Sequence, residues 1–269
     1  MVSAVTRISK EIIAGFDAGG GLLLLTDFDG TLTPIMSHPA SVRLAPETRE
    51  HLGLLSQHPR IRVGIVSGRD LRDLRERVGL PGLIYAGCHG LQVEGPRLSF
   101  AHPQAEARRT TMQKIGEWLT RRTASVPGVI VEPKRLTVAI HYRQVSRGML
   151  GRVAAQIEQV LYEHGGAFKL LRGRLVIEIL PHVGWTKGEC ALWIRDRVAL
   201  DFSGAVTMLY MGDDQTDEQA FRLLVGKALT IRVGGRGAHT AASYRLRDET
   251  EVQDLLSALA AETKVRGKP

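Results

Sequence analysis

The sequence predicts an α/β protein in which a parallel sheet is interrupted by an inserted module of helices and antiparallel strands. Short apolar runs alternate with amphipathic stretches from residue 22 to about residue 100 and again after Pro181, as in a parallel sheet covered by helices. Between these regions the order is helix, strand, strand, helix, strand, strand, which favours an antiparallel sheet with helices on one face. We therefore expect a core domain in two parts, 1–103 and 182–269, around an inserted αββαββ domain at 104–181.

The first core part is expected to alternate strands with helices. Leu22 to Leu25 form a continuous apolar run, which is typical of a strand buried on both faces. Pro46 suits the first turn of a helix, where its missing N–H is not needed, and Asp70 suits the N-cap of the next helix. We expect strands at 22–26, 61–66 and 83–86, helices at 46–56 and 71–78, and a hairpin at 91–100.

The inserted domain and the second core part follow the two patterns already described. In the predicted strand 136–143, Val138 and Ile140 share one face, while Ala139 and His141 share the other. We expect the first face to pack on helices and the second to be free for a polar ligand. Helices are expected at 106–122, 151–163, 188–196, 216–225 and 248–261, and strands at 129–131, 136–143, 168–171, 175–180, 205–211 and 228–233.

Composition narrows the class of protein. With 43% hydrophobic residues over 269 positions the chain can build a sizeable core, and Cys88 and Cys190 stand too far apart in the sequence for a C-x-x-C motif. No apolar run is long enough for a signal peptide or a membrane span, so we expect a soluble cytoplasmic protein, with a monomer as the default. The net charge of +8 raises nucleic acid as a partner, but the Arg-rich stretches 69–77 and 143–152 read as solvated helix faces. We therefore expect neither a nucleic-acid nor a membrane partner.

The strongest motif is Asp27-Phe28-Asp29-Gly30-Thr31, directly after the first predicted strand. The spacing of Asp27 and Asp29 places both side chains on one side of an extended backbone at the carboxyl end of the strand. Two carboxylates so close repel each other, so the site needs a cation or a shared proton. Gly30 permits a sharp turn, and Thr31 offers a hydroxyl and an N–H to an anion.

Three further motifs follow strands or open helices. Ser67-Gly68-Arg69 follows the strand at 61–66, and the Ser67 hydroxyl can donate to a phosphate oxygen. Lys187 stands where Thr186 would cap a helix, and a cation there opposes the helix dipole unless an anion binds nearby. Gly212-Asp213-Asp214-Gln215-Thr216-Asp217 follows another buried strand, and we expect Thr216 and Gln219 to form the capping box of the next helix.

Together the strand ends supply a carboxylate pair, a hydroxyl, a lysine and an acidic cluster. This set suits phosphoryl transfer through a carboxylate with Mg²⁺. The sequence contains no Walker A motif, G-x-S-x-G, H-E-x-x-H or complete G-x-G-x-x-G, so nucleotide cradles, serine esterases, zinc proteases and dinucleotide-binding domains lose support.

These four motifs resemble those of the haloacid dehalogenase superfamily of phosphatases, which have a Rossmann-like core. The αββαββ insertion between the second and third motifs resembles the branch with a large α/β cap. Within that branch the chain is similar to the trehalose-6-phosphate phosphatase family, from which it departs at Pro133 and at Leu180, where the family usually has Arg. The similar segments are Glu132-Pro-Lys134, His141-Tyr142-Arg143, Glu178-Ile-Leu-Pro181 and Gly87-Cys-His89-Gly90-Leu91.

The resemblance implies a Mg²⁺-dependent phosphoric monoester hydrolase that releases trehalose from trehalose 6-phosphate, a step of trehalose biosynthesis. It implies that Asp27 attacks phosphorus to form an aspartyl phosphate. Asp29 would protonate the leaving sugar oxygen and then activate water. The transferring phosphoryl group would be held by Thr31, Ser67, Gly68 and Lys187.

The resemblance also implies the metal and sugar ligands. Mg²⁺ would be bound by Asp27, the main-chain carbonyl of Asp29 and Asp213, with Asp214 and Asp217 supporting the metal or its waters. From the cap, the sugar would be bound by Glu132, Lys134, Arg143 and Glu178. In an unbroken strand Glu132 and Lys134 would face away from His141 and Arg143, so we expect a bend near Pro133.

Two alternatives stay open at this point. The core motifs determine the chemistry but not the leaving group, so the substrate could be another sugar phosphate or a glycerate phosphate. From a different class, the chain could be a basic nucleic-acid-binding or regulatory protein that has kept a phosphatase fold. Retention of every core acid and of Lys187 argues against the second alternative.

Overall fold

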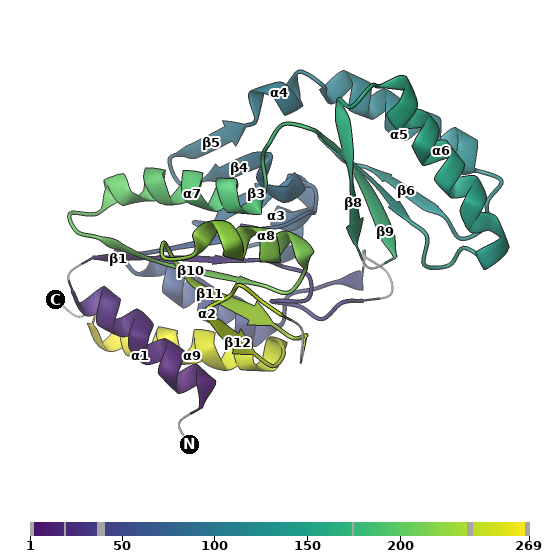
Figure 1. Ribbon diagram of the computed structural model, residues 1–269. Helices are drawn as coiled ribbons and strands as arrows, with labels where there is room; N and C mark the ends of the chain where they lie inside the picture. The colour runs from purple at the N-terminus through teal and green to yellow at the C-terminus, as the bar shows by residue number, and fades with distance from the viewer. Residues whose placement is uncertain (1–2, 19, 37–40, 174, 236–238, 267–269) are drawn as a thin grey trace. The chain divides into compact units, whose positions relative to one another are not determined.

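The run of leucines at 22–25 forms β1 (Gly21–Thr26), an inner strand of an eight-stranded sheet (Figure 1). All six residues of β1 are buried, because helices cover both faces of the sheet. The strand order is β12-β11-β10-β1-β2-β3-β4-β5, with β4 antiparallel to β3 and the strands from β12 to β3 parallel. The other strands are β2 (Ile61–Val66), β3 (Ile84–Gly87), β4 (Gln92–Gly95), β5 (Leu98–Ala101), β10 (Val206–Gly212), β11 (Leu229–Val233) and β12 (Tyr244–Leu246).

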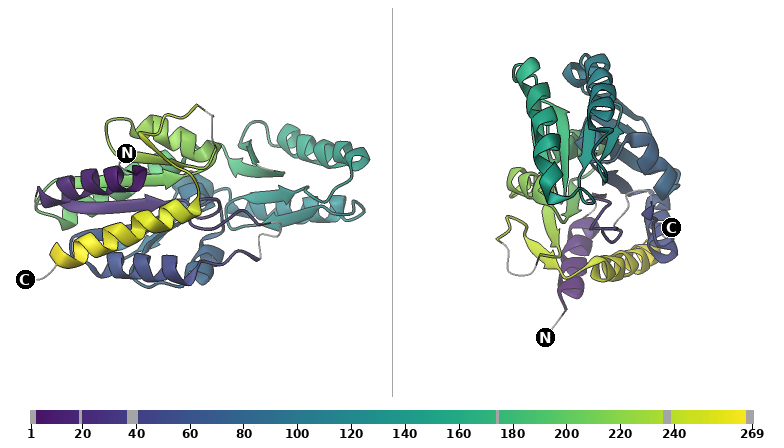
Figure 2. Two further views of the ribbon diagram at one scale, coloured as in Figure 1. Left: turned by 90° about the horizontal axis from the view of Figure 1, so that it is seen from below. Right: turned by 90° about the vertical axis from the view of Figure 1, so that its right-hand side faces the viewer.

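Helices cover the two faces of this sheet. One face, which includes Leu22 and Leu24, shares an apolar cluster with α1 (Ala4–Asp17), α2 (Pro46–Gln57), α3 (Leu71–Val78) and α9 (Glu249–Arg266). On the opposite side lie α7 (Lys187–Val198) and α8 (Gln215–Leu224) (Figure 1). The views of Figure 2 show α1 and α9 alongside each other. The predicted parallel sheet with flanking helices is therefore confirmed.

The computed structural model describes residues 3–18, 20–36, 41–173, 175–235 and 239–266. Contacts divide the chain into a core unit, 1–100 with 186–269, and a cap unit, 101–185. The cap unit contains an antiparallel sheet in the order β6-β7-β9-β8 and three helices. Its elements are α4 (Pro103–Glu106), α5 (Arg109–Thr123), β6 (Ile130–Pro133), β7 (Val138–His141), α6 (Leu150–Glu163), β8 (Phe168–Gly173) and β9 (Val176–Pro181).

The two faces of the cap sheet have different surroundings. Val138, Ile140 and Ile179 pack with apolar residues of α5 and α6, as the alternation in the sequence predicts. The opposite face carries Ala139 and His141, because neighbouring residues of a strand alternate between faces. The helix predicted at 106–122 is divided into α4 and α5.

Two elements are absent from the sequence prediction. Ser3 caps α1, whose Ile8, Ile12 and Phe16 are buried at helical spacing. The short strand β12 pairs with β11 at the edge of the sheet. Among the described residues, no helix has both the length and the apolar character needed to cross a membrane.

Candidate active site

Three parallel strands end next to one another at the candidate active site. β10, β1 and β2 are neighbours in register, with Met211 beside Thr26 and Thr26 beside Ile65. The segments after these strands carry Asp213-Asp214, Asp27-Phe-Asp29 and Ser67-Gly-Arg69, respectively. The structure therefore brings three of the sequence motifs to one edge of the sheet, which is where ligands of open α/β sheets bind.

The fourth motif joins them through Lys187. Thr186 caps α7 and Lys187 is its first residue, with a side chain that is only 2% exposed. Its Nζ lies 3.0 Å from Oδ2 of Asp27 and 3.0 Å from Oδ1 of Asp217. Burial lowers the pKa of Lys187, but the carboxylates of Asp217 and Asp27 outweigh burial and hold this pKa well above its usual value. These carboxylates offset the unfavourable position of the cation at a helix N-terminus.

Buried carboxylates crowd the space beside Lys187. Burial raises the pKa of Asp27 well above its usual value, that of Asp213 to about 7 and that of Asp217 to about 6, and neighbouring carboxylates add to each rise. One oxygen from each of these three residues lies within 4.8 Å of the other two. An excess of buried carboxylate oxygens suits a hard divalent cation. The residues present therefore fit Mg²⁺.

Within the acidic cluster Asp217 differs from Asp27 and Asp213. Its Oδ1 accepts from Lys187 Nζ and from the Tyr210 hydroxyl, at 3.0 and 2.9 Å. Its Oδ2 accepts from the N–H groups of Asp213 and Asp214, at 3.0 and 3.2 Å. Asp217 thus orients the lysine and the acidic loop, while Asp27 and Asp213 are better placed to offer oxygens to a cation.

The capping box of α8 is not the predicted one. Asp214 is the N-cap, and it forms the box with Asp217 instead of Thr216 with Gln219. The carboxylate of Asp214 accepts from the N–H and hydroxyl of Thr216 and from the N–H of Asp217. An Asp at the N-cap is as effective as Thr, and here it also fixes the loop that carries Asp213.

Gly30 and Thr31 place the turn after β1 against Asp213. Gly30 has φ +84°, and a Cβ on it would lie 2.3 Å from Oδ2 of Asp213. A side chain is therefore excluded at this position by backbone conformation and by space. The Thr31 hydroxyl donates to Oδ1 of Asp213 at 3.2 Å.

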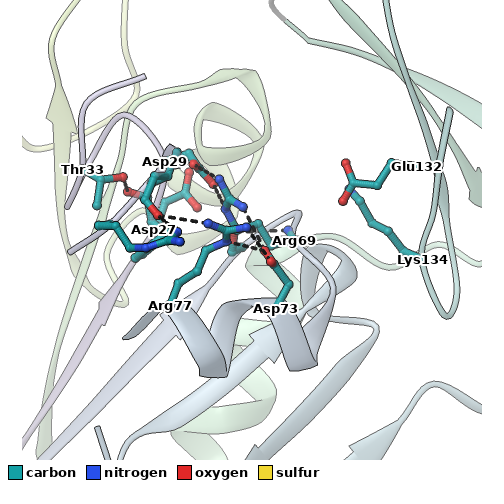
Figure 3. A network of polar contacts seen from close by, with 12 residues as sticks. Asp27, Asp29, Thr33, Arg69, Asp73, Arg77, Glu132 and Lys134 are labelled. Carbon is teal, nitrogen blue, oxygen red and sulfur yellow. Dashed lines mark hydrogen bonds and ion pairs between the residues drawn. The ribbon is translucent and has the colours of Figure 1, made fainter. Parts of the chain in front are cut away.

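The Ser67 motif lies at the end of β2. Ser67 is buried, and its hydroxyl oxygen accepts from the N–H of Arg69 at 3.2 Å. A Cβ on Gly68 would lie 2.7 Å from Cε1 of His89, so the glycine lets the backbone approach that ring. Arg69 binds Asp29 with two nitrogens, at 2.6 and 2.7 Å (Figure 3).

The cap unit gathers a separate polar cluster. Glu132 on β6 is opposite Ala139, and Ala139 is opposite Glu178 on β9, so these residues share one face of the sheet. His141 Nε2 lies 2.8 Å from Oε2 of Glu132. Oε1 of Glu178 accepts from Lys134 Nζ at 2.9 Å and from the Thr137 hydroxyl at 2.6 Å.

The bend expected near Pro133 is a turn between two strands: β6 ends at Pro133 and β7 begins at Val138, with antiparallel pairing between them. The turn reverses the chain, so Glu132 and His141 project from the same face. Arg143 is exposed in the turn after β7 and is not part of the strand predicted at 136–143.

Sequence reasoning missed three residues that organise these clusters. They are Arg69 beside Asp29, Tyr210 beside Asp217, and His141 beside Glu132. Arg69 and His141 belong to motifs described above, but a sequence motif does not show which distant carboxylate each side chain contacts. Tyr210 carries a hydroxyl near the end of an apolar strand run, which is the signal that could have indicated it.

The chain is similar to known proteins over most of its length. A model of the family described as trehalose-phosphatase matches residues 25–250. The trehalose-phosphate phosphatase of Mycobacterium tuberculosis (strain ATCC 25618 / H37Rv) is 36% identical over 244 residues, which cover 88% of this chain and 61% of that protein. The chain thus spans about three fifths of the length of this relative.

Two solved structures share the fold. A trehalose-6-phosphate phosphatase related protein has a TM-score of 0.79 and 24% identity, over 91% of this chain and all of the other. A haloacid dehalogenase-like hydrolase from Bacteroides thetaiotaomicron has a TM-score of 0.60 and 14% identity, over 88% of this chain and 98% of the other. The α/β core with a cap is therefore that of haloacid dehalogenase-like proteins, and the match over most of the chain shows that it belongs to the trehalose-phosphatase family.

Proposed function

We propose that the chain is a Mg²⁺-dependent phosphatase that hydrolyses trehalose 6-phosphate to trehalose and phosphate. The observation that supports this most directly is the buried contact of Lys187 with Asp27 and Asp217, at 3.0 Å each. A buried lysine against a buried nucleophile provides the positive charge that a transferring phosphoryl group requires. Family membership and the name of the mycobacterial relative support the choice of trehalose 6-phosphate.

In the proposed reaction an oxygen of Asp27 attacks phosphorus, and the bond from phosphorus to the sugar oxygen breaks. Asp29 gives a proton to that leaving oxygen, so trehalose departs as a neutral alcohol. Asp29 then takes a proton from water, whose oxygen attacks the aspartyl phosphate, and phosphate and free Asp27 are released. Thr31, Ser67, Gly68 and Lys187 hold the phosphoryl oxygens in both steps, and Lys187 offsets their charge.

Asp27, Asp213 and the main-chain carbonyl of Asp29 are the proposed ligands of Mg²⁺. When bound, the ion would compensate the crowded carboxylates and polarise the phosphoryl group. Asp214 and Asp217 act indirectly, since both are engaged in hydrogen bonds that fix the loop around Asp213. In the cap unit Glu132, Lys134, Arg143 and Glu178 are the proposed sugar ligands. The contact of Glu132 with His141 and the ion pair of Lys134 with Glu178 support a preorganised polar face.

The remaining parts of the proposal concern partners and location. We propose a cytoplasmic monomer whose partner is a small-molecule substrate, without a nucleic-acid or membrane partner. Size-exclusion chromatography checks the monomeric state. A salt-dependent retention test on a DNA column checks the absence of nucleic-acid binding.

The function is tested by phosphate release from trehalose 6-phosphate, glucose 6-phosphate, sucrose 6-phosphate and mannosyl phosphoglycerate, each with Mg²⁺ and with EDTA. We expect Mg²⁺-dependent preference for trehalose 6-phosphate. Preference for another ester would keep the mechanism and overturn the substrate. Asp27→Asn should abolish turnover and leave the fold intact, because it keeps the shape of the side chain. Near-normal turnover of that variant would rule out the proposed nucleophile.

A further inference from the structure

A chain of ion pairs runs from Asp29 along one side of α3 (Figure 3). Arg69 holds both carboxylate oxygens of Asp29, at 2.6 and 2.7 Å, and its NH1 donates to Asp73 at 2.9 Å. Arg77 in turn holds both oxygens of Asp73, at 2.7 Å each, and donates to the carbonyl of Val42 at 3.0 Å. Asp73 and Arg77 are four residues apart in α3, on one helical face, and Arg69 reaches Asp73 from the segment before the N-cap residue Asp70.

The contact with Arg69 occupies the two Asp29 oxygens that the proposed chemistry needs. To protonate a leaving oxygen or to activate water, Asp29 must turn at least one oxygen from Arg69 to the reacting atoms. The Arg69 side chain is only 10% exposed, so it requires a carboxylate partner when Asp29 turns away. Asp73 already contacts Arg69 and can serve as that partner.

Arg77 keeps Asp73 in place for this task. Burial raises the pKa of Asp73, but hydrogen bonds from Arg77 and Arg69 outweigh burial and lower it below its usual value. Asp73 is therefore a stable negative charge, and the grip of Arg77 on both of its oxygens prevents it from following Arg69 toward Asp29. The side chain of Arg77 is 12% exposed, and its bond to Val42 holds it in turn.

We propose that Asp73, held by Arg77, is a positioning residue that shares Arg69 with Asp29 and so allows Asp29 to be released for proton transfer. This inference rests on the proposed function, because it concerns the acid and base of that reaction. Without the Asp73 charge, less of the positive charge of Arg69 is balanced on the side away from Asp29, so Arg69 binds Asp29 more tightly. Proton transfer to the leaving group is then slower, while the phosphate site around Lys187 is unchanged.

The same helix offers a matched control. Arg72 and Glu76 form an ion pair with the same spacing of four residues, at 2.9 Å, but their side chains are 87% and 65% exposed. Glu76→Gln therefore removes a helical ion pair of α3 without touching the network. Asp73→Asn removes the charge inside the network and keeps the side-chain shape.

The experiment compares kcat/KM of Asp73→Asn, Glu76→Gln and the unmodified chain on two substrates. Trehalose 6-phosphate has a poor leaving group that requires a proton, whereas p-nitrophenyl phosphate has a leaving group that departs without one. Since kcat/KM covers the steps up to the first release, it reports proton donation and not the later attack of water. For Asp73→Asn we expect a loss of about tenfold or more on the sugar phosphate and of less than about twofold on the aryl phosphate.

Glu76→Gln should change neither value by more than about twofold. An equal loss on both substrates, or no loss on the sugar phosphate, would overturn the inference. Asp73→Glu keeps the charge and should recover most of the activity on the sugar phosphate; failure to recover, with an unchanged melting curve, would also count against it.

Failure of the proposed function gives a different result from failure of the inference about Asp73. If the unmodified chain prefers a different alkyl phosphate, the substrate assignment is overturned. The loss of kcat/KM in Asp73→Asn on that ester, compared with the loss on p-nitrophenyl phosphate, then decides the role of Asp73. If it hydrolyses neither alkyl nor aryl phosphates, both proposals fall.

Discussion

The Nζ atom of Lys187 lies 3.0 Å from Oδ2 of Asp27, and both side chains are almost fully buried. The proposed nucleophile is thus in direct contact with the cation that would hold the phosphoryl group. A second carboxylate, Asp217, fixes Nζ from the other side at 3.0 Å. The lysine is therefore part of the packed interior as well as of the site, and its removal should affect both.

Lys187→Met should lower phosphate release by at least about 100-fold, because the charge that stabilises the transition state is lost. The free energy of unfolding should fall by about 3 kcal/mol, because Asp27 and Asp217 lose their buried partner. Phosphate assays and urea unfolding measure the two effects. Lys227→Met, at an exposed position of the core unit, is the control and should change neither.

Gly30→Ala should damage the site through space and not only through backbone strain. Gly226 has a similar φ of +70° but open space around it, so Gly226→Ala isolates the cost of the left-handed conformation, about 1 kcal/mol. At Gly30 the new Cβ would meet the carboxylate of Asp213 at 2.3 Å, so we expect a larger loss of unfolding free energy and loss of phosphatase activity. Equal effects of the two variants would contradict the contact.

The thermal stability should depend on pH in a direction that Mg²⁺ counteracts. Without metal, Asp213 and Asp217 keep their protons to about pH 7 and 6, whereas an unfolded Asp loses its proton near pH 4. The folded state binds more protons between these values, so the contribution of these groups to the free energy of unfolding is fully present below about pH 4 and is lost as the pH rises through 6 and 7. In EDTA we therefore expect these two carboxyl groups to make the Tm lower at about pH 8 than at about pH 5.

Mg²⁺ competes with those protons, so the increase in Tm on adding Mg²⁺ should be larger at about pH 8 than at about pH 5. Asp213→Asn should reduce this increase. An increase of the same size at both pH values would argue against a cation held by these carboxylates.

Glu132→Ala tests the polar face of the cap unit. Loss of a charged hydrogen-bonding group that binds the sugar should lower kcat/KM on trehalose 6-phosphate by about tenfold or more and on p-nitrophenyl phosphate by less than about twofold. Glu158→Ala, at an exposed position of α6, is the matched control. Equal losses on the two substrates would show that Glu132 has no part in sugar binding.

The sequence predicts most of the fold because the inner core strands are rich in apolar residues and some helices carry clear caps. β2 coincides with the predicted strand at 61–66, and Asp70 and Thr186 cap α3 and α7 as expected. The sequence analysis does not predict α1, because polar residues interrupt its four buried apolar residues and no turn signal precedes it. β12 has three residues, too few for a period to be visible.

The site is predicted less completely, for a physical reason. The end of each predicted strand shows which residues follow it at the edge of the sheet. The sequence therefore predicts that Asp27, Ser67 and Asp213 lie close together. The strand ends do not show which long side chain reaches across from one loop to the next. The sequence therefore indicates Arg69 only as part of a turn and not as the partner of Asp29. In the cap unit the sequence predicts the bend near Pro133 but not the pairing: Glu132 and His141 meet through the register of β6 with β7, which alternation along a single strand cannot show.

The position of β1 between β2 and β10 has a consequence for how the polypeptide acquires its shape on the ribosome. Leu22 pairs with Ile61 on one side and with Thr207 on the other, so one neighbour of β1 is synthesised early and the other only after the whole cap unit. Until then the side of β1 that faces β10 has no strand partner, and such non-local pairing is slow and prone to aggregation. The nascent chain must therefore shelter this edge of β1 until β10 has been synthesised.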